Sequence, residues 1–125
     1  MPILTKRLAQ GIYYHQWMGN VLITEVLEAF ETEMVLFHND DIEKYVAILD
    51  GKDVKTLPIN IPKLTEASSG HELITLIYKP PKVAYTLGKM VSKLVNIPVE
   101  FYNDWDETIA RANQLIEQYQ ATNVE

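Results

Sequence analysis

Three histidines, His15, His38 and His71, are the side chains of this chain best suited to acid–base or metal chemistry. Histidine titrates near neutral pH and is a common metal ligand. No two of the three have the i, i+4 spacing that would place a pair of ligands on one face of a helix. A structural role is therefore favoured, and an enzyme that uses His15 or His71 with a nearby carboxylate is the least favoured function.

Carboxylates gather in two short segments, Asp40-Asp41-Glu43 and Asp104-Asp106-Glu107. The first lacks the spacing and the glycine of a calcium loop, and the second has the spacing of a helix capping box. The chain has no cysteine, and its five glycines form neither a phosphate-binding loop nor a nucleophile elbow. We therefore expect no catalytic residue, no metal site and no cofactor.

Aromatic side chains are concentrated in the segment from Ile12 to Met18. If this segment is a strand, Tyr13, His15 and Trp17 share one face, because side chains alternate between the faces of a sheet. Core packing explains such a row, but Tyr13 and Trp17 would also suit the wall of a hydrophobic cleft. Binding of a small hydrophobic molecule or lipid is thus the alternative function.

Four lysines, Lys79, Lys82, Lys89 and Lys93, lie just before or along one predicted helix, in a chain with a formal net charge of -6. A solvated surface explains them, but they would also dock an acidic protein partner. The acidic residues of the segment Glu25 to Glu28 would equally allow association with a second copy as a homodimer. The negative net charge disfavours binding to nucleic acid.

The elements that must position these residues begin with a predicted hairpin. Residues 4–8 and 12–18 are its two strands, with Gln10-Gly11 at the turn. Asn20 is predicted to cap a helix that runs to about His38 on helically spaced apolar residues. The apolar run Tyr45 to Leu49 then predicts a central strand that ends at Asp50-Gly51.

The second half of the chain alternates in the same way. Pro62 is expected to begin a short, irregular crossover helix that ends at Gly70, and residues 73–78 form the next strand. A helix is predicted from Lys82 to just before Asn96, and a short strand over residues 99–102 precedes a last helix capped near Asp104. The apolar stripe predicted for the third helix consists of Val83, Leu87, Met90, Val91 and Leu94.

The predicted order of elements is ββαβαβαβα, which defines the fold class as α/β. Strands that alternate with helices imply right-handed crossovers and a mixed, mostly parallel sheet, to which the initial hairpin adds an antiparallel edge. A length of 125 residues suits one domain, and neither a linker nor a repeat divides it. We therefore expect residues 1–125 to form a single domain.

This order of elements, with Asp50 at the end of a strand, Gly88 inside a helix and Asp106-Glu107-Thr108-Ile109-Ala110 at the start of the last helix, resembles the STAS family. STAS domains of the anti-sigma factor antagonist type, similar to the sporulation protein SpoIIAA, are non-enzymatic switches. The resemblance implies a regulatory or protein-interaction domain, which is the leading expectation for this chain. Lipid-handling relatives of the architecture are consistent with the alternative.

In that family a Ser or Thr at the start of the helix after the third strand is phosphorylated by a partner kinase. This chain departs from the pattern, because Lys52 and Ile59-Asn60 stand where the family has its serines. Thr56 is the nearest hydroxyl and is the candidate phosphorylation site. A phosphate there would add nearly two negative charges beside a helix N-terminus.

The remaining expectation concerns location. Residues 1–7 lack the apolar core of a signal peptide, and no run of the chain approaches the roughly 20 apolar residues of a membrane span. The expected location is therefore the cytoplasm, with no segment crossing a membrane.

Overall fold

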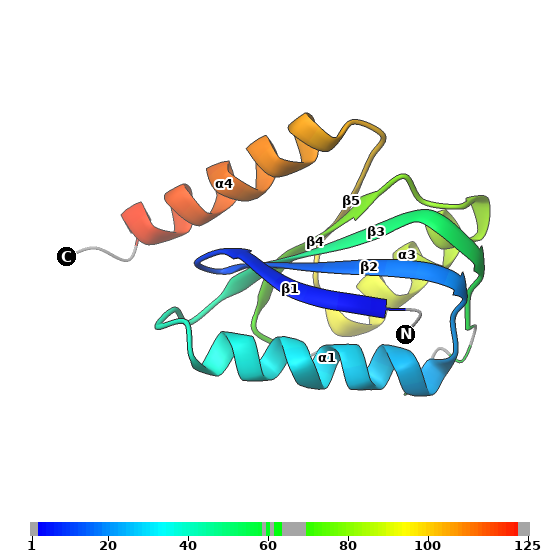
Figure 1. The fold of residues 1–125 in the computed structure, drawn as a ribbon. Coiled ribbons are helices and arrows are strands. Elements are labelled where there is room, and N and C mark those ends of the chain that lie inside the picture. Colours follow the sequence, from blue (N-terminus) through cyan, green and yellow to red (C-terminus); the bar gives the residue numbers. More distant parts are fainter. Residues whose placement is uncertain (1–2, 59, 61, 64–69, 123–125) are drawn as a thin grey trace.

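The computed structural model describes residues 3–58, 60, 62–63 and 70–122 of the chain. Its centre is a five-stranded mixed sheet with the strand order β1-β2-β3-β4-β5 (Figure 1). β1 pairs with β2 antiparallel, and every other neighbouring pair is parallel. Three helices, α1, α3 and α4, cover the sheet within the described part of the chain.

The predicted hairpin is confirmed as β1 (Ile3–Ala9) and β2 (Ile12–Asn20). Gly11 occupies the turn with a φ of 75°, a conformation that favours glycine. A Cβ at this position would also lie 2.9 Å from Ile116 Cδ1 of the last helix. The turn therefore needs glycine for its backbone angle and for close packing.

The helix α1 (Ile23–His38) begins later than predicted. Leu22, rather than Asn20, is the N-cap residue, and its amide donates a hydrogen bond of 2.7 Å to the Glu25 carboxylate. Asn20 is instead the last residue of β2, where its side chain accepts a hydrogen bond from Thr56. The prediction for this cap was wrong because the strand continues to Asn20.

The strand β3 (Tyr45–Thr56) is longer than predicted, and the expected end at Asp50-Gly51 is wrong. The end of β2 continues to pair with it, with Met18 opposite Asp53 and Gly19 opposite Val54. Glycine suits this position of the strand, since an added Cβ on Gly51 would lie 3.1 Å from the Lys79 carbonyl oxygen. A turn signal in the sequence is thus overridden by strand pairing.

The remaining elements are β4 (Glu72–Tyr78), α3 (Lys82–Val95), β5 (Val99–Tyr102) and α4 (Trp105–Thr122). The predicted cap of α4 is confirmed, because the Glu107 amide donates to the Asp104 carboxylate at 3.0 Å. Pro62 and Lys63 are helical, but residues 64–69 of the expected crossover helix lie outside the described part of the chain.

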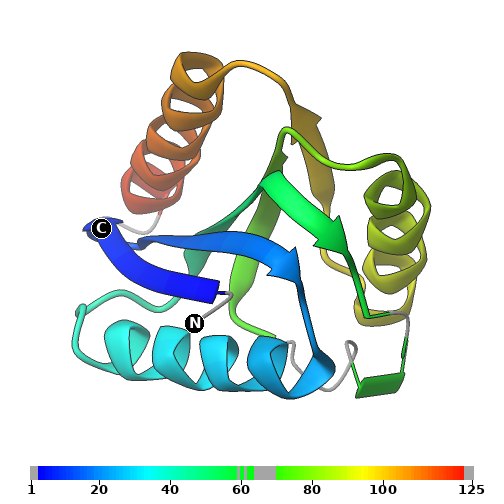
Figure 2. The same cartoon turned by 45° about the vertical axis from the view of Figure 1, so that its right-hand side comes forward.

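The helices form two layers on either side of the sheet, as Figure 2 shows. α4 covers one face, where Ala112 and Ile116 pack on Ile12, Val46 and Leu76. α1 and α3 lie on the other face, where Val26 and Ala29 of α1 pack near Trp17, and Gly88 of α3 lies close to Ile77 and Phe101. Alternation along β2 therefore sends its aromatic side chains to both layers, as the sequence predicted.

The α/β class, the antiparallel hairpin and the mostly parallel sheet are confirmed at this level. Among the described residues, no helix combines the length and the apolar character that a membrane crossing requires.

Candidate functional site

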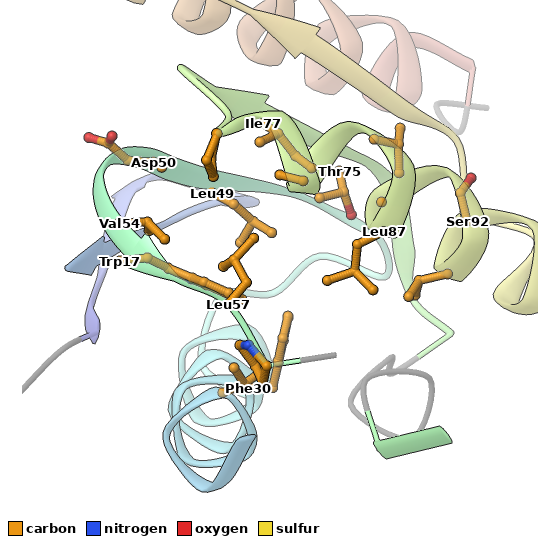
Figure 3. A pocket seen from close by; sticks show the side chains of 18 of the residues that line it. Trp17, Phe30, Leu49, Asp50, Val54, Leu57, Thr75, Ile77, Leu87 and Ser92 are labelled. Carbon is orange, nitrogen blue, oxygen red and sulfur yellow. The ribbon is translucent and has the colours of Figure 1, made fainter. Parts of the chain in front are cut away.

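A cavity of about 140 Å³, which we call the α1–α3 pocket, lies between the sheet and the helices α1 and α3 (Figure 3). Leu49, Thr75 and Ile77 form its floor on the sheet. The lining is almost entirely apolar. Its walls include Val26 and Phe30 from α1, Ala84, Leu87, Gly88 and Val91 from α3, and Trp17, Val54 and Leu57 from the end of the sheet.

The pocket lies over the centre of the sheet. Thr75 lies on β4 between β3 and β5, paired with Ala47 on one side and Val99 on the other. A side chain on an inner strand beneath a helical layer is normally buried, yet Thr75 and Leu49 are both partly accessible. Because both line the cavity, their accessibility indicates that the helices leave this part of the sheet uncovered.

Trp17 is the one residue of the predicted ligand pair that lines the pocket. Its side chain is 9% exposed, and its Nε1 has no hydrogen-bond partner among the described residues. A buried indole N–H usually finds an acceptor, so this group carries an energetic cost. Tyr13, the other residue of the pair, is absent from the pocket lining and is fully buried beside Tyr45.

Three apolar residues of α3 are exposed to solvent. Tyr85 packs on Phe101 of the edge strand β5, with ring centroids 4.6 Å apart. This contact identifies the side of α3 that lies toward β5. Helical spacing places Val83, Met90 and Leu94 on the opposite side, toward α1. They are 47%, 45% and 63% exposed, so the predicted stripe on this helix is partly buried at Leu87 and Val91 and exposed at the other three.

The charged residues that line the pocket are both acids, Asp50 and Glu72. Asp50 is 1% exposed, and its carboxylate accepts a 2.5 Å hydrogen bond from the Tyr14 hydroxyl on the α4 side of the sheet. Burial and this hydrogen bond raise the pKa of Tyr14. The Lys52 amide also donates to Asp50, so this carboxylate is engaged away from the cavity.

His15 belongs to a buried polar network beneath α1. Its Nε2 lies 2.7 Å from Glu33 Oε1, and its Nδ1 lies 2.8 Å from Thr5 Oγ1. Tyr45 donates to the second oxygen of Glu33 at 2.8 Å. The order hydroxyl, imidazole, carboxylate resembles a hydrolytic triad, but none of these residues lines the α1–α3 pocket, and His15 and Glu33 are both 0% exposed. The geometry suits a structural tie between β2 and α1.

A second buried carboxylate, Asp40, ties the end of α1 to the hairpin. It accepts hydrogen bonds from Arg7, from the Gly11 amide and from the Tyr13 hydroxyl, at 2.7 to 2.9 Å. Burial alone would raise the pKa of Asp40, but these donors outweigh it and hold the pKa below its usual range. Tyr13 is thus a structural donor, and burial and this bond raise its own pKa.

The other residues singled out in the sequence are dispersed. Thr56 is exposed at the end of β3, where its hydroxyl donates to Asn20 at 3.0 Å, rather than at the start of a helix. Lys79, Lys82, Lys89 and Lys93 are all exposed, and the three on α3 share the side that faces away from the sheet. His71 is exposed, with its ring 5.2 Å from that of Phe37.

The sequence reasoning missed most of the pocket. Its lining comes from four strands and two helices, and apolar residues such as Leu49 and Val91 carry no signal that separates a cavity wall from a core. Thr75 is the exception, because a polar residue within the apolar strand Leu73 to Tyr78 is a readable signal.

Comparisons with models of protein families, with curated proteins and with solved structures found no match to this chain.

Proposed function

We propose that this domain is a non-enzymatic binding module that holds a small hydrophobic molecule in the α1–α3 pocket. The observation that carries the proposal is the cavity of about 140 Å³ with its nearly apolar lining. Protein interiors are normally packed without voids larger than a water molecule. An apolar cavity of roughly 150 Å³ in another protein stays dry and binds benzene, so a void of this size is sufficient for a ligand.

The two tryptophans provide a direct test, because Trp17 lines the pocket and Trp105 packs against Tyr14 and Tyr78 on the other face. Trp105→Phe leaves Trp17 as the only fluorophore, and Trp17→Phe leaves Trp105. Saturating toluene should change the emission of the Trp105→Phe variant and leave that of the Trp17→Phe variant unchanged. Equal responses, or none from Trp17, would contradict the proposal.

A second test fills the cavity. Ala84 lines the pocket and is 7% exposed, whereas its neighbour Val83 is 47% exposed and does not line the pocket. Ala84→Phe should abolish the rise in melting temperature that toluene gives, since a bound ligand stabilises the folded state. Val83→Phe is the matched control and should keep most of it. Toluene that stabilises the Ala84→Phe variant as much as the unaltered protein would place the ligand elsewhere.

We also propose, as a second candidate function, that α3 docks a protein partner, in the manner expected of a STAS-like interaction domain. The supporting observation is that Lys82, Lys89 and Lys93 are exposed on a helix with no acidic residue. The partner that best matches is a second copy of the chain. The outer side of α1 exposes Glu28 and Glu31 in the same layer, so a two-fold axis would pair each basic helix with an acidic one.

Charge swaps test this homodimer. Light scattering after gel filtration should give a mass near twice the chain mass at low salt, and Lys89→Glu with Lys93→Glu should give a monomer. Mixing that variant with one carrying Glu28→Lys and Glu31→Lys should restore a dimer of the two. A monomer for the unaltered protein at every concentration would exclude the homodimer.

A further inference from the structure

We propose that the ligand of the α1–α3 pocket is a neutral molecule about one aromatic ring in size, whose single polar atom hydrogen-bonds to the Thr75 hydroxyl. This inference rests on the proposed ligand-binding function and adds the chemical class of the ligand.

Thr75 supplies the polar contact. Its backbone is held in the sheet, where its amide donates to the Pro98 carbonyl at 3.0 Å, but its hydroxyl has no hydrogen-bond partner among the described residues. Figure 3 shows its side chain among those that border the cavity, between Ile77 and Leu87. A hydroxyl that faces an apolar void lacks a partner, so a ligand atom that pairs with it gains a bond that the empty site does not have.

The charges around the pocket specify a neutral ligand. No lysine, arginine or histidine is among the described residues that line the cavity, and the acids there are Asp50 and Glu72. An anionic ligand would lose its hydration and find no positive partner among these residues. The lysines of α3 do not change this, because they lie on the side of the helix that faces away from the sheet.

The volume limits the size of the buried part. A void of about 140 Å³ is close to the roughly 150 Å³ that is known to accept benzene. It is too small for the whole of a long acyl chain, so a larger molecule would extend out of the pocket. The minimal ligand is therefore one ring with one small polar substituent.

Three probes of similar size separate these requirements: toluene has no polar atom, acetophenone has a neutral acceptor, and benzoate has a negative charge. Acetophenone should bind the unaltered protein about five-fold more tightly than toluene, the effect of one net hydrogen bond. Benzoate should bind at least ten-fold more weakly than acetophenone. Titrations followed by Trp17 fluorescence in the Trp105→Phe background give all three dissociation constants.

Thr75→Val tests the assigned residue, because valine keeps the branched shape and removes the hydroxyl. The variant should bind toluene at least as tightly as before and lose the five-fold preference for acetophenone. Thr86→Val is the matched control, since Thr86 is exposed on α3 and does not line the pocket, and it should keep the preference.

Different results would contradict the contact with Thr75, the class of ligand, or the proposed binding function itself. If toluene binds but acetophenone has no advantage, or keeps its advantage in Thr75→Val, the assignment to Thr75 is wrong and the pocket remains a ligand site. If benzoate binds as tightly as acetophenone, the ligand class is wrong. If none of the probes binds, the proposed function itself fails.

Discussion

The two faces of the sheet are covered in different ways. On one face α4 lies along the inner strands, and Ala112 and Ile116 complete a continuous cluster with Ile12, Val46 and Leu76. On the other face α1 and α3 pack over different parts of the sheet, and the α1–α3 pocket lies between them. The first face is a packed core, and the second is a core with a gap at its centre.

The difference shows how a small α/β domain can make a binding site without losing its core. A single helix over the middle of a sheet buries the inner strands, whereas two helices placed apart leave those strands accessible between them. Close contacts hold α3 in place, because a Cβ on Gly88 would lie 3.3 Å from Ile77 and 3.4 Å from Phe101. The α1–α3 pocket therefore lies beside a tightly packed contact between α3 and the sheet.

The largest loss of stability is expected beneath α1, where buried polar bonds add to the apolar contacts between helix and sheet. Glu33→Ala removes the carboxylate that pairs with His15 and Tyr45, and leaves both groups buried without it. Each buried polar group left without its partner costs about 1–3 kcal/mol, so the loss of two such bonds should cost about 3–5 kcal/mol, which urea unfolding measures. Glu33→Gln, which keeps an acceptor, should cost less. A loss below about 1 kcal/mol for Glu33→Ala would show that this half of the face does not depend on the network.

The next prediction compares the two faces directly. Ile116→Ala removes a side chain that is 6% exposed in the packed face and should cost about 3 kcal/mol. Leu87→Ala removes a partly exposed side chain that already borders a void, and should cost only about 1 kcal/mol. Both values come from urea unfolding. Equal losses would mean that the two faces are equally well packed.

A smaller loss of stability is expected on replacing Asp40, which joins the hairpin to α1 on the pocket side of the sheet. Its pKa is below the ordinary 3.8, so its ionised form stabilises the fold above about pH 4, and this contribution is lost as the pH falls further. Asp40→Asn should therefore cost about 1–2 kcal/mol at pH 7 and progressively less below pH 4. Unfolding curves at pH 3 and pH 7 provide the comparison, and a constant difference would contradict it.

The smallest loss of stability is expected on breaking the ion pair between α4 and β5. Arg111 donates to both oxygens of Glu100, and hydrogen bonding by Arg111 lowers the pKa of Glu100. Both side chains are about one-third exposed, so Arg111→Ala should cost no more than about 0.5 kcal/mol, and less at 1 M salt. Toluene binding should be unchanged. A change in that binding would show that the two faces are coupled.

Periodicity predicted most of the elements, including the hairpin, the three described helices and the capped start of α4. It failed where pairing between distant segments decided the outcome. β3 continues through Gly51 because the end of β2 pairs with Asp53 and Val54, and the sequence around Gly51 contains no trace of that partner. In the same way, the apolar spacing on α3 could not show that Val83, Met90 and Leu94 stay exposed.

The sequence by itself determined the α/β class, the alternation that sends Tyr13, His15 and Trp17 to one face of β2, and the exposure of the lysines on α3. These features follow from local periodicity and local charge. Only the tertiary structure decided that His15 hydrogen-bonds to Glu33 and that the Tyr13 hydroxyl donates to Asp40. It also decided that Trp17 and Thr75 line one cavity. The physical reason is that a void is defined by the space between elements far apart in the chain, and no local pattern measures that space.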